Sequence, residues 1–338
     1  MVKLYYAKTA LRYIEKGLLK MRGLSDSFLS DLNGGCLTQL VSAVKADDTL
    51  CMEIREDYVN VYYRGGNLYC VKKDSKRAGL YNFSFDRNYH KHKNSVLSNF
   101  DEGTFSQCKS CEDHVKYIPV LKTEMDLWFG ENPKYEREYQ QLVLRENSYS
   151  GSDTTGNGIS KDTDYFIVDV EYADNSNNSR FDMVAVKWLS TSAERRSSQN
   201  AKLALIEMKY ADAAHDGTAG IVKHFEDISR FASAGKIDSL CDETEIVFNQ
   251  KRMLGLIKGI DKDLKLNRAL SPEFIILAAN HKPDKTVFQR ELRKAIDQFP
   301  DLRNSIDIKI ATASNMGYGL YANDKYMLSL EKFFEKLD

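Results

Sequence analysis

Two carboxylates and one lysine form the most chemically informative pattern in this chain. Glu207 and Lys209 lie two residues apart in the short apolar run Leu203–Tyr210. Side chains alternate between the two faces of a strand, so this spacing predicts that both point the same way while Met208 points into a core. Asp182 begins another short apolar run, and pairing of the two strands would bring it to the same spot. Two carboxylates beside an amine can hold a divalent cation and a nucleophilic water.

The surrounding hydrophobic pattern predicts the elements that position these residues. A helix, three strands, a second helix and a fourth strand follow one another along the chain. Their predicted bounds are about 133–145, 165–172, 181–189, 203–210, 219–232 and 273–279. The 25 positions between Asp182 and Glu207 include a polar loop over Ser190–Asn200.

This αβββαβ order, with an Asp on one strand and a Glu-x-Lys on the next, resembles the PD-(D/E)xK nuclease superfamily. The resemblance implies an α/β (α+β) restriction-endonuclease-like fold with a mixed central sheet. Phe181 stands where the superfamily often has proline. The resemblance further implies that Asp182 and Glu207 bind Mg²⁺, with Mn²⁺ able to substitute, and that Lys209 orients or deprotonates water. The implied activity is phosphodiester hydrolysis, with DNA as substrate and a role in restriction or anti-phage defence.

Further acidic residues compete for a place in this site. The superfamily often adds a glutamate from the first helix, for which Glu138 is the preferred candidate and Glu136 the alternative. Asp169 and Glu171 share a face of the preceding strand, where they either extend the acidic pocket or face solvent at the strand end.

The second helix of the pattern carries Lys223 and His224, for each of which an ordinary solvated helix face is the favoured interpretation. The alternative is that Lys223 contacts a phosphate and His224 transfers a proton. The polar loop before this helix, Asp212–Gly217, offers His215 as a further candidate.

The chain length favours two parts, an N-terminal α+β region over residues 1–125 and a second domain over 126–338, which the resemblance implies is the nuclease domain. The first part is predicted to hold a helix over 27–45, interrupted at Gly34-Gly35, and an antiparallel sheet of four strands at 50–55, 58–63, 67–72 and 79–85. Residues 88–118 show no clear pattern. Helices at 236–260, 284–298 and 329–337 and a strand at 306–311 complete the prediction.

The distribution of charge along the chain indicates which kinds of molecule the protein could bind. The net charge is −1, but residues 64–93 hold eight Lys/Arg and two Asp, a net charge of +6, with aromatic residues between them. Such a segment suits nucleic acid, with Arg64 as a candidate phosphate contact. The alternative is a solvated sheet face whose aromatic residues are core. The N-terminal region could equally form a homodimer or bind a partner subunit.

Two other features narrow the class of protein. No apolar run approaches membrane-spanning length, the first residues lack a secretory pattern, and the six scattered cysteines favour a cytoplasmic protein. His90, His92, Cys108 and Cys111 could in principle hold zinc, although a single C-x-x-C is a weak signal. A non-catalytic nucleic-acid-binding or protein-interaction subunit with a nuclease-like fold is the competing interpretation.

Overall fold

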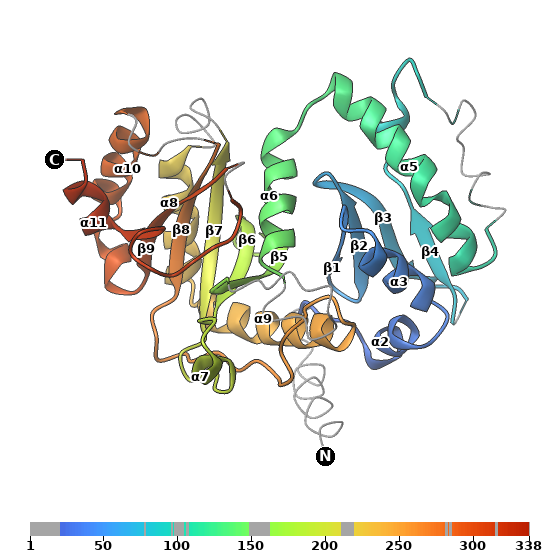
Figure 1. Ribbon diagram of the computed structural model, residues 1–338, viewed down its shortest axis with the longest axis horizontal. Helices are drawn as coiled ribbons and strands as arrows, with labels where there is room; N and C mark the ends of the chain where they lie inside the picture. The colour runs from blue at the N-terminus through green and yellow to red at the C-terminus, as the bar shows by residue number, and fades with distance from the viewer. Residues whose placement is uncertain are drawn as a thin grey trace.

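The computed structural model describes residues 21–77, 79–95, 97, 105, 108–148, 163–210, 220–280, 283, 286–314 and 317–337. It is a mixed α+β structure with two sheets (Figure 1). One is antiparallel and four-stranded, and the other is mixed and six-stranded. Residues 149–162 and 211–219, which include His215, lie outside the described residues.

The N-terminal sheet is a meander in the order β1-β2-β3-β4. Its strands are β1 (Leu50–Ile54), β2 (Tyr58–Tyr63), β3 (Gly66–Lys73) and β4 (Tyr81–Ser84), preceded by α2 (Asp26–Asn33) and α3 (Thr38–Ala46). The predicted helix break and all four strands are confirmed. The β2–β3 hairpin turns at Arg64 and Gly65, which have φ of 50° and 70°. A two-residue turn with positive φ at both positions matches the twist of the paired strands.

A long helix that the sequence pattern did not predict follows this sheet. After the short η1 (Arg87–His90), α5 runs over Cys111–Glu131 and packs on α3 and β3. Ser110 and Asp113 form a capping box at its start, and Pro119 lies inside it. The predicted division between residues 125 and 126 falls within this helix.

The six-stranded sheet has the order β10-β9-β8-β7-β6-β5. Strands β5, β6 and β7 are antiparallel neighbours, β8 and β9 continue the sheet in parallel, and β10 closes it antiparallel. The strand bounds are β5 Tyr165–Asp174, β6 Ser179–Lys187, β7 Lys202–Tyr210, β8 Glu273–Ala279, β9 Asp307–Ala313 and β10 Met327–Ser329. The predicted strands are confirmed, and β10 is additional.

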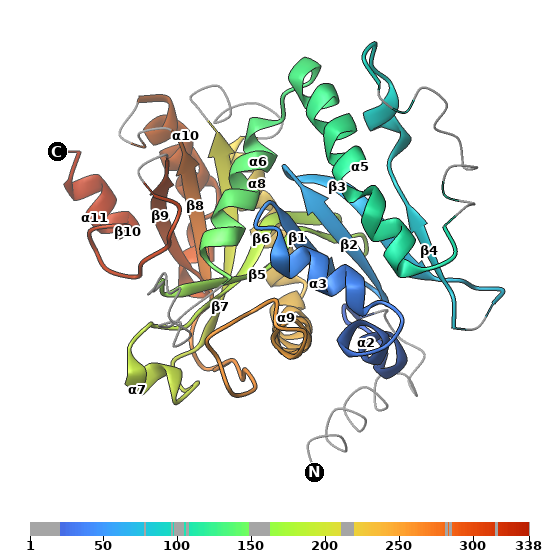
Figure 2. The ribbon, with the colours of Figure 1, turned by 45° about the vertical axis from the view of Figure 1, so that its right-hand side comes forward.

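Helices cover this sheet on both faces (Figures 1 and 2). Helix α6 buries Val143 and Leu144 against one face, and α8 buries Phe225 and Ile228 in the cluster on the other. The helices are α6 (Tyr135–Glu146), α7 (Ser192–Arg195), α8 (Ile221–Ser233), α9 (Lys236–Met253), α10 (Thr286–Gln298), η4 (Pro300–Asn304) and α11 (Leu330–Glu335). Helix α9 stands between α8 and β8 in the chain, so the observed order is α6-β5-β6-β7-α8-α9-β8.

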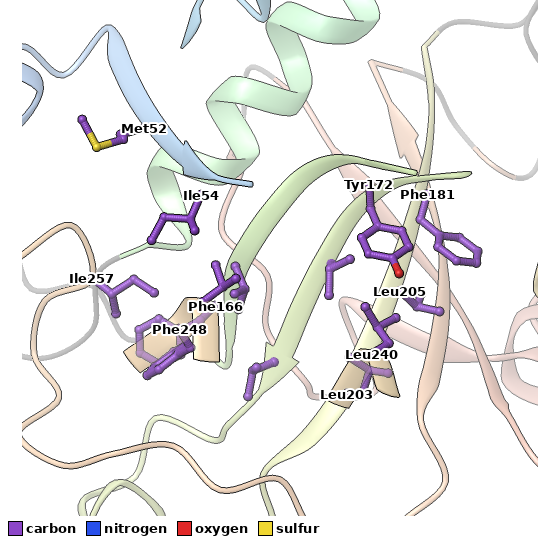
Figure 3. Close-up of a cluster of buried hydrophobic side chains, with 14 of the residues drawn as sticks. Met52, Ile54, Phe166, Tyr172, Phe181, Leu203, Leu205, Leu240, Phe248 and Ile257 are labelled. Atoms are coloured by element: carbon purple, nitrogen blue, oxygen red, sulfur yellow. The ribbon is translucent and has the colours of Figure 1, made fainter. Parts of the chain in front are cut away.

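The two sheets share one hydrophobic core. Figure 3 shows Met52 and Ile54 of β1 in the same cluster as Phe166 of β5 and Phe248 of α9. Burying apolar surface from both regions in a single cluster is the main favourable contribution to their association. The two predicted parts are therefore packed together over a continuous interior.

Ion pairs are buried at the same junction. Asp169 on β5 is 3% exposed and pairs with Arg22 and Arg55, while Lys251 on α9 lies 2.8 Å from both carboxylate oxygens of Glu53. The expectation that Asp169 faces solvent or extends the acidic pocket is wrong, because its carboxylate is enclosed between the two sheets. No helix among the described residues has the length and apolar content needed to cross a bilayer.

Candidate active site

The register of β6 and β7 places Asp182 beside Glu207. Met183 pairs with Ile206, so Asp182 is one residue beyond the last registered pair and opposite Glu207. Directly opposed residues of antiparallel strands project from the same face with their Cβ atoms close together. The backbone N–H of Met208 donates a 2.8 Å hydrogen bond to Oδ2 of Asp182, which fixes this carboxylate against β7.

Alternation along β7 separates the chemical residues from the core residue between them. Met208 is fully buried in the cluster beneath α6, so Glu207 and Lys209 point to the opposite face, which α8 covers. Glu207 is 1% exposed and Lys209 is 4% exposed. The predicted common direction of these two side chains is confirmed.

The electrostatics show that the three groups act on one another. Burial raises the pKa of Asp182 well above its usual range, Glu207 adds to this rise, and Lys209 opposes it. Burial also raises the pKa of Glu207 to about 8, again with Lys209 opposing. Glu207 therefore disfavours the charged form of Asp182, whereas contact with Asp182 favours the charged form of Glu207, and Lys209 favours the charged form of both.

The helix carboxylate that joins this cluster is Glu136. It also raises the pKa of Asp182, and one of its oxygens lies 3.4 Å from the backbone nitrogen of Tyr210. The preference for Glu138 is wrong, because that carboxylate accepts hydrogen bonds from Arg64 at 2.7 and 3.0 Å.

Arg64 is the partner of Glu138 in this ion pair. Its guanidinium also contacts Asp126 at 2.9 Å, so the structure engages it between two carboxylates at the tip of the β2–β3 hairpin. Within the part of the chain that the structure describes, Arg64 has no contact with Asp182, Glu207 or Lys209.

Helix α8 brings one of its two predicted residues to the cluster. Nδ1 of His224 lies 2.9 Å from Oε2 of Glu207. Lys223 instead pairs with Glu226 at 2.9 Å and Asp227 at 3.0 Å on its own helix. His224 therefore belongs to the site, and Lys223 is engaged on the surface of α8.

The donor set fits a divalent cation. Both oxygens of Glu207 are buried, and neither receives a hydrogen bond of ordinary geometry from the described residues. Buried carboxylate oxygens without donors are costly unless a cation or proton meets them. No group of three or more His, Cys, Asp or Glu side chains that could hold a metal occurs among the described residues, so the remaining ligands would be backbone, water and substrate oxygens.

The predicted zinc ligands do not form a site within the described ranges. Nε2 of His92 lies 3.0 Å from the fully buried Glu124 of α5, and Nδ1 of His90 lies 3.6 Å from it. Cys111 is instead buried at the start of α5. The two histidines thus serve the interior of the N-terminal region.

One signal in the sequence could have identified Glu136. The buried residues of α6 are Gln140, Val143 and Leu144. Glu136 lies four residues before Gln140 and seven before Val143, so it falls on the same buried face of the helix. Glu138 does not have this spacing.

Comparison with known proteins gives no family for this chain. No family model matches it, and searches of curated proteins and of solved structures find no match.

Proposed function

We propose that this protein is a metal-dependent nuclease with a PD-(D/E)xK-like core. The proposal is carried by one observation, the convergence of Asp182, Glu207 and Lys209 at one place on β6 and β7. The order α6-β5-β6-β7-α8-α9-β8 supports a restriction-endonuclease-like arrangement, with α9 as an addition.

Each residue of the cluster has a role in the proposed reaction. Asp182 and Glu207 would hold Mg²⁺ or Mn²⁺, which when bound supplies positive charge to the phosphate and to the leaving oxygen. As an ammonium, Lys209 offsets the charge of both carboxylates and would orient the attacking water; as the neutral amine, it would accept the proton of that water at Nζ. His224 braces the carboxylate of Glu207 from α8, and Glu136 adds negative charge from α6.

The substrate class follows from the same chemistry. A cation held by two carboxylates and flanked by a lysine suits hydrolysis of a phosphodiester. DNA is the proposed substrate and restriction or anti-phage defence the proposed setting, both by resemblance to the superfamily.

A cleavage assay tests the proposal. Purified protein is incubated with plasmid, linear duplex and single-stranded DNA in Mg²⁺, Mn²⁺ or EDTA. Metal-dependent cleavage should fall by about a hundredfold or more in Lys209→Ala and Asp182→Asn, because each removes a group that acts on the transition state. Glu112→Gln is the control, since this carboxylate is exposed on α5 and pairs with Lys116 of the same helix at 3.0 Å.

Three results separate the candidate functions. Cleavage that the two site variants abolish and the control retains supports the nuclease. Salt-sensitive DNA binding without cleavage favours a non-catalytic binding subunit. If the protein neither cleaves nor binds DNA, that result excludes nucleic acid as its partner.

A further inference from the structure

Four tyrosines gather beside the acidic cluster. The rings of Tyr135 and Tyr210 are stacked with centroids 5.5 Å apart and planes at 26°. Tyr139 contacts Tyr210 at 4.9 Å and Tyr318 at 5.8 Å between ring centroids. The group draws on α6, on the end of β7 and on the segment before β10, so three distant parts of the chain supply it.

The tyrosines adjoin the proposed catalytic residues at the end of β7, with Tyr210 on the α6 face of the sheet and Glu207 and Lys209 on the α8 face. Tyr210 directly follows Lys209 on β7, and Tyr135 directly precedes Glu136 on α6. The backbone nitrogen of Tyr210 lies 3.4 Å from Oε2 of Glu136, so the end of β7 and the first turn of α6 are in contact. In Figure 1 the first turn of α6 and the arrowhead end of β7 lie at the same end of the sheet.

Tyr135 leaves much of its ring uncovered. It is 51% exposed, although large aromatic side chains in this protein are mostly buried. One face of the ring rests on Tyr210, so the exposure belongs to the rest of the ring. Lys134 and Arg137 flank it on the same turn and are exposed, which places two cations beside the aromatic surface, of which Arg137 also pairs with Glu171 at 3.4 Å.

We propose that Tyr135, supported by Tyr210 and Tyr139, is a stacking platform for an unpaired nucleobase, and that the substrate is single-stranded nucleic acid. This inference rests on the proposed nuclease function, which it narrows. Bases in a duplex are covered on both faces by their neighbours, whereas an unpaired base can stack on an aromatic ring. Lys134 and Arg137 suit the phosphates on either side of such a base.

A binding experiment in EDTA tests the platform without cleavage. The probe is a fluorescein-labelled oligothymidylate, compared with the same strand carrying abasic sugars and with a duplex. The abasic strand keeps every phosphate and lacks the bases. Tyr135→Ala should weaken binding of the intact single strand by about tenfold, the scale of one lost base stack, while its binding to the abasic strand should stay unchanged.

Two further variants control for folding and for exposure. Tyr135→Phe keeps the ring and should bind as the native protein does. Tyr326→Ala removes a tyrosine that is 52% exposed beside β10, the edge strand three places from β7, and should also leave binding unchanged.

The outcomes separate this inference from the nuclease proposal. Selective loss for the intact strand in Tyr135→Ala supports the platform even if no cleavage is seen. If Tyr135→Ala weakens binding of the intact and abasic strands equally, or of neither, the stacking platform is overturned. The nuclease proposal would still stand, because it is tested separately by metal-dependent cleavage. Loss in Tyr135→Phe as large as in Tyr135→Ala would also contradict stacking.

Discussion

Glu136 and Glu138 are two residues apart on α6 and have different partners. Glu136 adds to the acidic cluster, whereas Glu138 binds Arg64. Glu136→Gln should lower the rate of metal-dependent cleavage by about tenfold or more, because it removes charge next to Asp182. Glu138→Gln is the matched control and should cleave at close to the native rate. Equal rates for the two variants would count against a role for Glu136.

Glu207 gives the metal-free protein a characteristic pH dependence. Burial raises its pKa to about 8, and an unfolded glutamate titrates near about 4.3. Between these values folding takes up a proton, so the contribution of this group to stability falls as the pH rises through that window. Glu207→Gln resembles the protonated form and should therefore unfold at a higher temperature than the native protein at pH above about 8, with a smaller difference near about 4.3.

Thermal unfolding in EDTA at a series of pH values measures this difference. Glu138→Gln serves as the control, because its carboxylate lies in a partly exposed ion pair. A native protein that is as stable as Glu207→Gln at alkaline pH would show that Glu207 is not held in an unfavourable environment.

At the residue scale the sequence predicted the core of the site and misplaced its periphery. The Glu-x-Lys spacing fixed the common direction of Glu207 and Lys209, because strand alternation depends only on the local backbone. The partners of Glu138 and Lys223 depend on which charged residues approach from elsewhere, and neither pairing follows from local periodicity.

Among the elements, the β2–β3 hairpin positions α6. Gly65 has φ +70°, and a Cβ there would lie 2.4 to 2.5 Å from backbone and side-chain atoms of Arg137. Its N–H also donates a hydrogen bond to Oε1 of Gln141 at 2.5 Å. The first turn of α6, which carries Glu136, is thus held by the tip of the N-terminal sheet.

Gly65→Ala should destabilise the protein and also impair cleavage. A left-handed conformation costs a non-glycine residue about 1–2 kcal/mol, and the steric overlap with Arg137 must displace α6 as well. Gly79→Ala is a matched control, because Gly79 has φ +78° and open space around its Cβ position. Urea unfolding and cleavage rates for both variants measure the two effects. An equal loss of stability, with cleavage retained in both, would show that the contact with α6 is unimportant.

The elements themselves were largely predictable, with α5 as the exception. Ile118, Leu121, Met125 and Phe129 are buried at helical spacing, but Pro119 interrupts the pattern. Proline in a helix interior removes a backbone hydrogen bond and usually indicates a break. Packing of α5 on α3 and β3 compensates for that cost, which is a tertiary effect that a local pattern does not contain.

Across the whole molecule, the buried ion pairs join the two sheets. Burial acts to raise the pKa of Asp169, but Arg55, Arg22 and Lys251 together hold it below its usual range. Asp169→Asn should lower the free energy of unfolding by about 3–5 kcal/mol, because it leaves Arg55 buried without its counter-ion. Glu171→Gln removes an exposed pair two residues along the same strand and should cost less than about 1 kcal/mol.

Urea unfolding at neutral pH checks both values. The stabilisation from Asp169 should also disappear in acid, as the pH falls from the unfolded pKa of about 3.9 through the lower folded value. Similar losses for the two variants would mean that the junction does not depend on this ion. Sequence reasoning could not locate the junction, because Asp169 and Glu171 look alike on a strand until the facing sheet is known.

The spacing of these ion pairs along the chain has a consequence for biosynthesis. Arg55 precedes Asp169 by 114 residues, and Glu53 precedes Lys251 by 198. On the ribosome Arg55 therefore stays hydrated while about a third of the chain is made, and Glu53 while more than half is made, since burial without a partner costs several kcal/mol. Contacts so distant in sequence also slow folding. We expect the N-terminal sheet to remain undocked in the nascent chain until α9 has emerged, so that chaperones meet an open, partly apolar sheet for most of translation.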